Sequence, residues 1–272
     1  MKKSYLNFLP YCIWITSFIL APTLIIFCFA FLNEEGNLTF YNIYRITNYF
    51  KIIFKSLLYT TVATAVCLFI AYPVSYFASK IKNNLNKKIF IILITLPMWT
   101  NLLLRTYSWM TILERNGLLN NLFRFLKLSP IKIINTPIAI IIVMAYDYLP
   151  FMILPIYTAI SKIDNNLIQA SEDLGAGNFK TFKYIILPLS TPGILSGTSI
   201  VFVSCCCSFL IPRLLGGGSN VLIGELIESQ FMGTIYNPWF GSAIAMFFML
   251  LIGIVIILTH KLNKTETENL RI

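Results

Sequence analysis

The sequence predicts an all-α integral membrane protein with six transmembrane helices and a cytoplasmic loop between the fourth and the fifth. Of its 272 residues, 57% are hydrophobic and only 12% are charged. The apolar residues collect in runs of 20 or more, and at about 1.5 Å per residue such a helix crosses about 30 Å of hydrocarbon. This composition excludes a soluble globular domain.

Six apolar runs are expected to span the membrane. The first run is too long for the core of a signal peptide, so we expect it to be retained. The third contains Arg105 and the fourth contains Asp147, which places two ionisable groups inside the hydrocarbon. The predicted spans cover residues 8–32, 56–79, 89–112, 137–160, 185–211 and 239–259, with a short helix at 117–128 in a loop.

Basic residues predict the orientation of these spans. Six spans place both termini on one side, and that side holds twelve Lys and Arg residues against eight on the other. Because short cytoplasmic loops are enriched in Lys and Arg, we expect both termini in the cytoplasm. The net charge of +10 follows from this topology and calls for no nucleic acid.

Several function classes are excluded by missing residues. The single His260 removes zinc-protease and catalytic-triad chemistry, and the six cysteines all lie in apolar runs. No G-x-x-x-x-G-K-[ST] phosphate loop is present, so the chain is not expected to bind ATP. Asp147 has no second membrane aspartate, which argues against an intramembrane protease. We therefore expect no enzyme, cofactor or metal site in this chain.

A polar segment, residues 161–184, separates the fourth and fifth apolar runs. Its apolar residues fall at positions 163, 167, 170 and 174, which marks one face of a helix. Asp164 is placed to cap this helix and Gly175 to end it. We expect two short helices joined at the glycine. Together they would form a surface knob to which another protein can bind. An amphipathic helix lying on the membrane is the alternative.

The spacing of this knob (residues 161–184) resembles the E-A-A loop of permease subunits of ABC importers, which have the MetI-like type 1 transmembrane fold. That loop reads E-A-A, three residues, G, nine residues, I-x-L-P. In this sequence Gln169 stands where that loop has Glu, and Ser171 stands where it has the second Ala. Both residues are expected to stay on the helix surface. The resemblance implies that contact with an ATPase is made by Asp164, Gln169, Ala170, Ser171, Gly175, Leu187 and Pro188.

Further segments, 96–107, 149–157, 213–218 and 223–231, resemble the permeases of spermidine/putrescine importers. The resemblance covers nearly the whole chain and implies a permease core at 53–260, after a first span and outer loop at 1–52 and before a cytoplasmic tail at 261–272. It implies a bacterial plasma (inner) membrane protein in the lipid bilayer. The implied partners are a second permease, two ATPase subunits that bind the ATP, and an extracytoplasmic polyamine-binding protein.

Charges inside the membrane are costly and mark candidate sites. Asp147 lies between two tyrosines, and an acid with aromatic neighbours suits a polyammonium cargo. Alternatively, Asp147 pairs with Arg105 and holds two helices together. Two glutamates in the last outer segment either contact cargo or form a solvated face. The candidate path consists of Asp147, Tyr146, Tyr148, Arg105, Tyr107, Glu225 and Glu228.

Other interpretations stay open at this point. Gly193, Gly197 and Cys205 place small residues along the fifth span, for packing either within the chain or against a second permease. A permease of the same fold could carry another solute, such as iron, thiamine or an anion. A secondary transporter is the alternative of another class, although the sequence shows no repeat.

Overall fold

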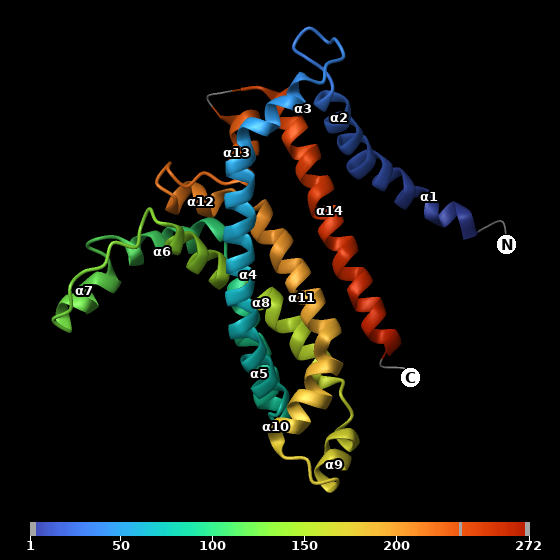
Figure 1. Cartoon of the computed structure of the whole chain (residues 1–272), viewed down its shortest axis with the longest axis vertical. Coiled ribbons are helices and arrows are strands. Elements are labelled where there is room, and N and C mark those ends of the chain that lie inside the picture. The colour runs from blue at the N-terminus through green and yellow to red at the C-terminus, as the bar shows by residue number, and fades with distance from the viewer. Residues whose placement is uncertain (1–3, 234–235, 270–272) are drawn as a thin grey trace.

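The computed structural model describes residues 4–233 and 236–269, and helices dominate them. Figure 1 shows a long bundle of α4, α8, α11 and α14, with short helices at its two ends. Among these described residues, five helical segments are long and apolar enough to cross a membrane, or six if one sharply bent pair counts as a span. The predicted all-α membrane fold is confirmed.

The first half of the chain forms two candidate spans and a bent third segment. Its elements are α1 (Ser4–Ile15), a π-helical turn (Thr16–Leu20), α2 (Ala21–Ala30), α3 (Tyr41–Arg45), a 3-10 turn (Ile46–Tyr49), α4 (Phe50–Ser79), α5 (Asn84–Thr95), a second 3-10 turn (Leu96–Trp99), α6 (Leu102–Leu113) and α7 (Leu118–Phe125). The helix of the second span thus begins well before the predicted residue 56.

The second half contains three long helices and the knob. Its elements are α8 (Pro137–Ser161), α9 (Asn165–Asp173), α10 (Asn178–Thr181), a π-helical turn (Phe182–Ile186), α11 (Leu187–Cys207), α12 (Leu210–Leu215), α13 (Ile223–Met232) and α14 (Pro238–Asn269). The sixth predicted span lies within α14, but this helix continues to Asn269. The tail predicted from residue 261 therefore begins as part of the same helix.

Helix α8 is the centre of the bundle, packed between α4 and α11. Cys67 and Ala71 of α4 are fully buried, one turn apart, and such small side chains let two helices approach closely. The Cys67 thiol donates a hydrogen bond to the carbonyl of Ala145 at 3.2 Å, and the Ser75 hydroxyl donates one to the carbonyl of Ile153 at 3.0 Å. The backbone of α8 is thereby held along one side.

The other side of α8 is held by the glycines of α11. A Cβ atom on Gly193 would lie 2.5 Å from the Cβ of Ala159 and 2.7 Å from the carbonyl oxygen of Pro155. On Gly197 it would lie 3.0 Å from the sulfur of Met152. The packing of these glycines within the chain is therefore confirmed, and their assignment to a face against a second permease is wrong.

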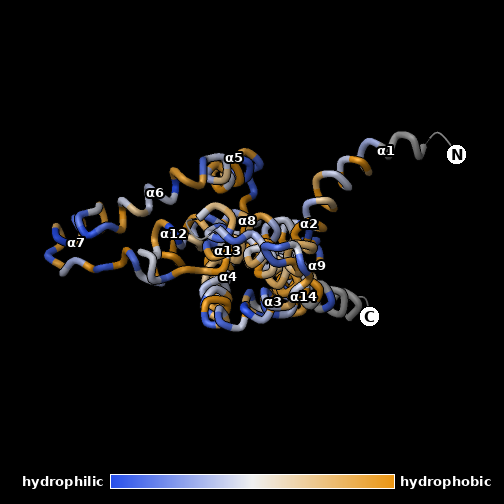
Figure 2. The backbone as a smooth tube through the Cα atoms, turned by 90° about the horizontal axis from the view of Figure 1, so that it is seen from above, coloured by the Kyte–Doolittle hydropathy of each residue, from blue (hydrophilic) through white to orange (hydrophobic). Residues whose placement is uncertain are grey.

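The third predicted span is corrected by the structure. Instead of one helix over residues 89–112, the segments Asn84–Trp99 and Leu102–Phe125 meet at an angle of 91°. Thr100 and Asn101 have extended backbones, and the Asn101 side chain accepts a hydrogen bond from the backbone N–H of Leu103 at 2.8 Å. This cap starts a new helix in a new direction. Figure 2 shows α6 and α7 leading away from the bundle.

The fifth span is also shorter than predicted. Helix α11 ends at Cys207, where the extended backbone of Ser208 interrupts it before α12. The predicted helix at residues 117–128 is confirmed as α7, somewhat shortened.

Candidate functional site

The knob lies at one end of the long axis of the molecule, beyond the ends of α8 and α11 (Figure 1). Helix α9 begins as predicted, because the side chain of Asp164 accepts a hydrogen bond from the backbone N–H of Asn166 at 2.9 Å. This bond satisfies one of the free N–H groups of the first turn. The predicted pair of short helices joined at a glycine is confirmed as α9 and α10.

Gly175 ends α9 in a left-handed conformation, with φ at +78°. Its N–H donates to the carbonyl of Glu172 at 2.9 Å, and the N–H of Ala176 donates to the carbonyl of Ser171 at 3.0 Å. These two bonds form the Schellman pattern that closes a helix. A Cβ atom here would meet nothing within 4 Å, so the requirement for glycine comes from the backbone conformation alone.

Ser171 differs from the expectation that it lies on the helix surface. It is buried, and its hydroxyl lies 2.8 Å from the hydroxyl of Thr181, which is buried as well. The bond joins α9 to α10 across the glycine turn. Because both side chains are short, it fixes the angle between the two helices. Ser171 therefore shapes the knob from inside, while Gln169 and Ala170 are exposed.

The outer surface of the knob carries large apolar side chains. Leu174 is 89% exposed, and Leu167, Phe179 and Tyr184 are also exposed. The apolar stripe predicted from the spacing is thus largely turned outward rather than into the bundle. A group of exposed apolar side chains on a polar segment is typical of a protein-protein contact.

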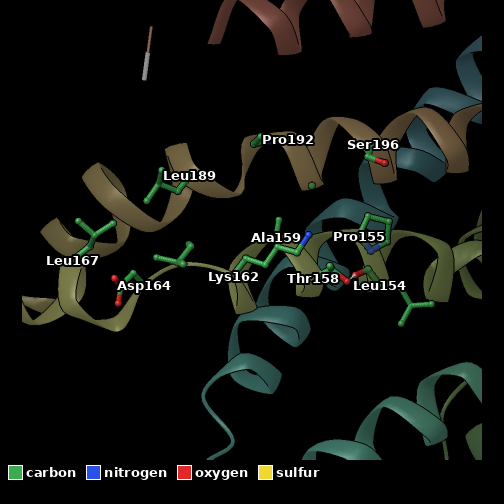
Figure 3. Close-up of a pocket in the computed structure, with 12 residues that line it drawn as sticks. Leu154, Pro155, Thr158, Ala159, Lys162, Asp164, Leu167, Leu189, Pro192 and Ser196 are labelled. Atoms are coloured by element: carbon green, nitrogen blue, oxygen red, sulfur yellow. Dashed lines mark hydrogen bonds between the residues drawn. The ribbon is translucent and has the colours of Figure 1, made fainter. Parts of the chain in front are cut away.

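A groove connects the knob to two spans. It measures about 800 Å³ and lies between the adjoining ends of α8 and α11. Figure 3 shows Pro155 of α8 on one side, Pro192 of α11 on the other, and Asp164 and Leu167 of the knob at one end. Residues of the knob and of both spans therefore line the same groove. Leu187 and Pro188, the remaining predicted contact residues, form the first turn of α11, with Leu187 exposed. Sequence reasoning missed this groove.

The two charges predicted inside the membrane are brought together. The Arg105 Nε of α6 lies 3.4 Å from the Asp147 Oδ1 of α8, with the Asp147 side chain fully buried and that of Arg105 13% exposed. Among the described residues, neither carboxylate oxygen accepts a hydrogen bond. The pair is close enough to neutralise both charges and still leaves the carboxylate without the hydrogen bonds that a closed ion pair usually has.

The tyrosines beside Asp147 have different surroundings. The ring of Tyr146 is 40% exposed and meets the ring of Trp109 edge-on, with centroids 5.2 Å apart. Tyr148 packs against the buried core instead. Tyr107 is half exposed. Tyr146 is therefore the tyrosine that combines an accessible ring with a position next to the buried charge, and Trp109 is a neighbour that sequence reasoning missed.

The two glutamates of α13 form a cluster with Arg213 of α12, a partner that the sequence did not predict. The Arg213 guanidinium pairs with the Glu228 carboxylate. Glu225 is half-buried, and one of its carboxylate oxygens has no hydrogen-bond partner in the described part of the chain. Burial raises the pKa of Glu225, although the nearby Arg213 charge opposes this change.

The helical membrane fold agrees with the comparisons with known proteins. Residues 6–264 match the family model described as "Binding-protein-dependent transport system inner membrane component". The chain belongs to this family. It is an all-helical permease subunit of an ABC importer, a multi-pass protein of the inner membrane, in a system that depends on a binding protein and an ATPase.

Relatives and solved structures support this assignment. The permease is 37% identical over 262 residues to the spermidine/putrescine transport system permease protein PotB of Haemophilus influenzae, covering 92% of this chain and 91% of the relative. Its identity to PotB of Escherichia coli is 33%, with 92% and 94% covered. A bacterial ABC transporter for alginate import superposes with a TM-score of 0.74 at 16% identity, covering 96% of this chain and 94% of that one, which shows a shared fold.

Proposed function

We propose that this permease imports polyamines, with spermidine and putrescine as the cargo class. The observation that carries the proposal is the identity of 37% to a spermidine/putrescine permease over 92% of the chain. The buried Asp147 carboxylate pairs with Arg105 and holds α6 against α8 beside the proposed path. The exposed ring of Tyr146 beside it adds a surface for cation–π contact.

The proposed assembly contains this chain, a second permease, two ATPase subunits and an extracytoplasmic polyamine-binding protein. Because the sequence holds no phosphate loop, energy has to reach the spans by mechanical contact. The exposed apolar residues of the knob supply the surface for an ATPase. When ATP closes the ATPase pair, α9 moves. The movement reaches α8 along the chain that joins the two helices, and it reaches α11 through α10 and the π-helical turn Phe182–Ile186.

The charge pair has a structural role in this proposal, with the cargo path beside it. Arg105 neutralises Asp147 and thereby joins α6, the second part of the bent third segment, to α8. Tyr146 and Tyr107 expose their rings on the same two helices, which places aromatic surface near the pair. Cargo then passes a site whose net charge is close to zero. Such a site binds a polyammonium chain weakly enough to release it.

Uptake into proteoliposomes tests the cargo class. The complete importer, with its binding protein and internal ATP, is expected to accumulate labelled spermidine or putrescine, because both share the charged ammonium groups that the path accepts. Excess unlabelled polyamine should abolish this uptake, whereas iron, thiamine and sulfate should leave it unchanged. Accumulation of one of those solutes without polyamine uptake would overturn the cargo class and leave the ABC permease assignment intact.

The proposed orientation places both termini and the knob in the cytoplasm. A single cysteine at position 180, in a cysteine-free background, should resist a membrane-impermeant thiol reagent added to whole spheroplasts, because Lys180 lies on the knob. A cysteine at position 37 should react. Strong labelling at 180 from outside would reverse the topology.

A further inference from the structure

A second cavity lies beneath α9, at the knob end of the bundle. It measures about 630 Å³ and is enclosed by the turn after α4, the start of α5, the end of α8 and α9 itself. Lys80, Lys82 and Lys87 line it, and Glu172 is the one carboxylate among the lining residues. Three positive charges therefore face one negative charge around a partly open cavity.

In the part of the chain that the structure describes, none of these lysines forms an ion pair with a carboxylate. Instead, two of them stack on tyrosines. The Nζ of Lys80 lies 4.4 Å from the ring centroid of Tyr76, and that of Lys87 lies 5.5 Å from the ring centroid of Tyr157. A cation–π contact holds an ammonium group in place without neutralising it. The cavity therefore keeps its positive charge.

The polar groups around the lysines favour an anion as well. Gln169 lines the cavity at the position where the related loops carry a glutamate. An amide at this position supplies N–H donors, whereas a carboxylate would have cancelled one more lysine. Asn84 and Asn165 add further amides, and Ser161 adds a hydroxyl.

We propose that this cavity binds a phosphate group, carried either by a phospholipid headgroup or by a soluble phosphate anion. Charge-assisted hydrogen bonds from lysines to phosphate oxygens are stronger than neutral ones. Because α4 and α8 are candidate membrane spans, we expect the cavity at their ends to lie near the headgroup region, where basic pockets between spans bind anionic lipids. The bound anion would link the turn after α4 to α9 and hold the knob against the spans. This site is independent of the cargo.

Lysine footprinting on the assembled importer tests the proposal. Acetylation of each lysine is followed by mass spectrometry in two pairs of conditions. The first pair is detergent solution with inorganic phosphate or with chloride at equal ionic strength. The second pair is nanodiscs of phosphatidylcholine with or without phosphatidylglycerol. Lys88 is the internal control, because it follows Lys87 and is exposed but does not line the cavity.

We expect Lys80, Lys82 and Lys87 to be acetylated several-fold more slowly than Lys88 when the ligand is present. Slowing only with phosphatidylglycerol identifies the lipid as the source, and slowing only with inorganic phosphate identifies the soluble anion. Equal labelling in all four conditions overturns the site. The site is also overturned if acetylation of these lysines slows whenever the ATPase subunits are present, whatever the phosphate or lipid. In that case the lysines contact protein.

Variants sharpen this test, and the yield of assembled complex serves as the folding control for each. Lys87→Gln should abolish the protection of Lys80 and Lys82, while Lys88→Gln should leave it unchanged. Glu172→Gln should extend the protection to lower ligand concentration, because it removes the lining carboxylate. Equal effects of Lys87→Gln and Lys88→Gln would indicate a general surface field and contradict a defined site.

Discussion

Helix α8 and the N-terminal span have similar hydropathy but very different surroundings. The mean hydropathy is 2.0 for α8 and 2.3 for residues Pro10–Ala30. Half of the α8 window is buried inside the protein, whereas none of the N-terminal window is. α8 packs between α4 and α11, whereas the N-terminal span meets the bundle where α2 lies against α14 (Figure 1).

The difference shows that hydropathy assigns a helix to the membrane but not to the core. In lipid no hydrophobic force separates a core helix from a peripheral one, so close packing and polar contacts decide. α8 receives hydrogen bonds from Cys67 and Ser75, meets the glycines of α11 and carries half of a charge pair. The N-terminal span presents bulky side chains such as Trp14 and Phe18 outward, as suits contact with lipid or another subunit.

The largest expected effect comes from breaking the charge pair in the core. Asp147→Asn leaves Arg105 buried without a counter-ion, which costs about 3 kcal/mol or more. We expect the amount of folded complex to fall sharply for Asp147→Asn and for Arg105→Gln, and to recover in the double variant. Complex yield and polyamine uptake are measured for all three variants.

The same three variants separate the two roles of Asp147. Recovery of both yield and uptake in the double variant confirms the structural pair and rules out a cargo contact. Normal yield with lost uptake, in Asp147→Asn and in the double variant, would contradict the structural role and assign Asp147 to the cargo.

A pair of glycine variants compares core and periphery directly. Gly193→Val drives a side chain into Ala159 and Pro155, which are already in contact, and overpacking of this kind costs about 1–3 kcal/mol. Gly253 of α14 has nothing within 4 Å of its Cβ position. Gly253→Val should therefore leave the thermal midpoint of the complex within experimental error. Equal losses for the two variants would contradict the view that α11 packs on α8 more tightly than α14 packs on its neighbours.

The sequence predicted most of this fold because each feature was local. Runs of apolar residues mark spans, Asp164 and Gly175 carry their own capping chemistry, and the loop spacing can be read by counting. The bend at Thr100 could not be predicted in the same way. The apolar run continues through it, and the break depends on an extended backbone and the Asn101 cap, which hydropathy does not register.

The candidate site was predicted less completely, because its contacts join distant parts of the chain. The Arg105–Asp147 pair could be predicted, because opposite charges inside hydrocarbon are costly unless they pair. The Ser171–Thr181 hydrogen bond could not be predicted, since the sequence indicates ordinary surface positions of short helices for both residues. The lysine cavity was visible only as a basic turn at residues 80–88, since the enclosure by α8 and α9 appears in three dimensions alone.

The knob offers a test in a region with few packing constraints. Gly175→Val forces a β-branched residue into the left-handed conformation, at a cost of about 1–2 kcal/mol. The substitution should displace the knob surface that is proposed to contact the ATPase. We expect the complex to insert in the membrane but to lose uptake. Gly177→Val is the matched control, because Gly177 also has open space but an ordinary φ of −70°. Equal uptake by both variants would remove the knob from the coupling mechanism.

The smallest expected effect concerns Glu225, at the half-buried edge between core and periphery. Burial raises its pKa above the ordinary 4.5, so its charged form destabilises the fold at neutral pH. That cost fades as pH falls through the raised pKa toward 4.5 and is absent below it. Glu225→Gln should therefore raise the thermal midpoint slightly at pH 7 and have no effect in acid. Glu228→Gln should lower the midpoint at pH 7 instead, because it breaks the pair with Arg213. Were both variants to shift the midpoint in the same direction, the two glutamates would share one environment, and this edge of the molecule would behave as a solvated surface.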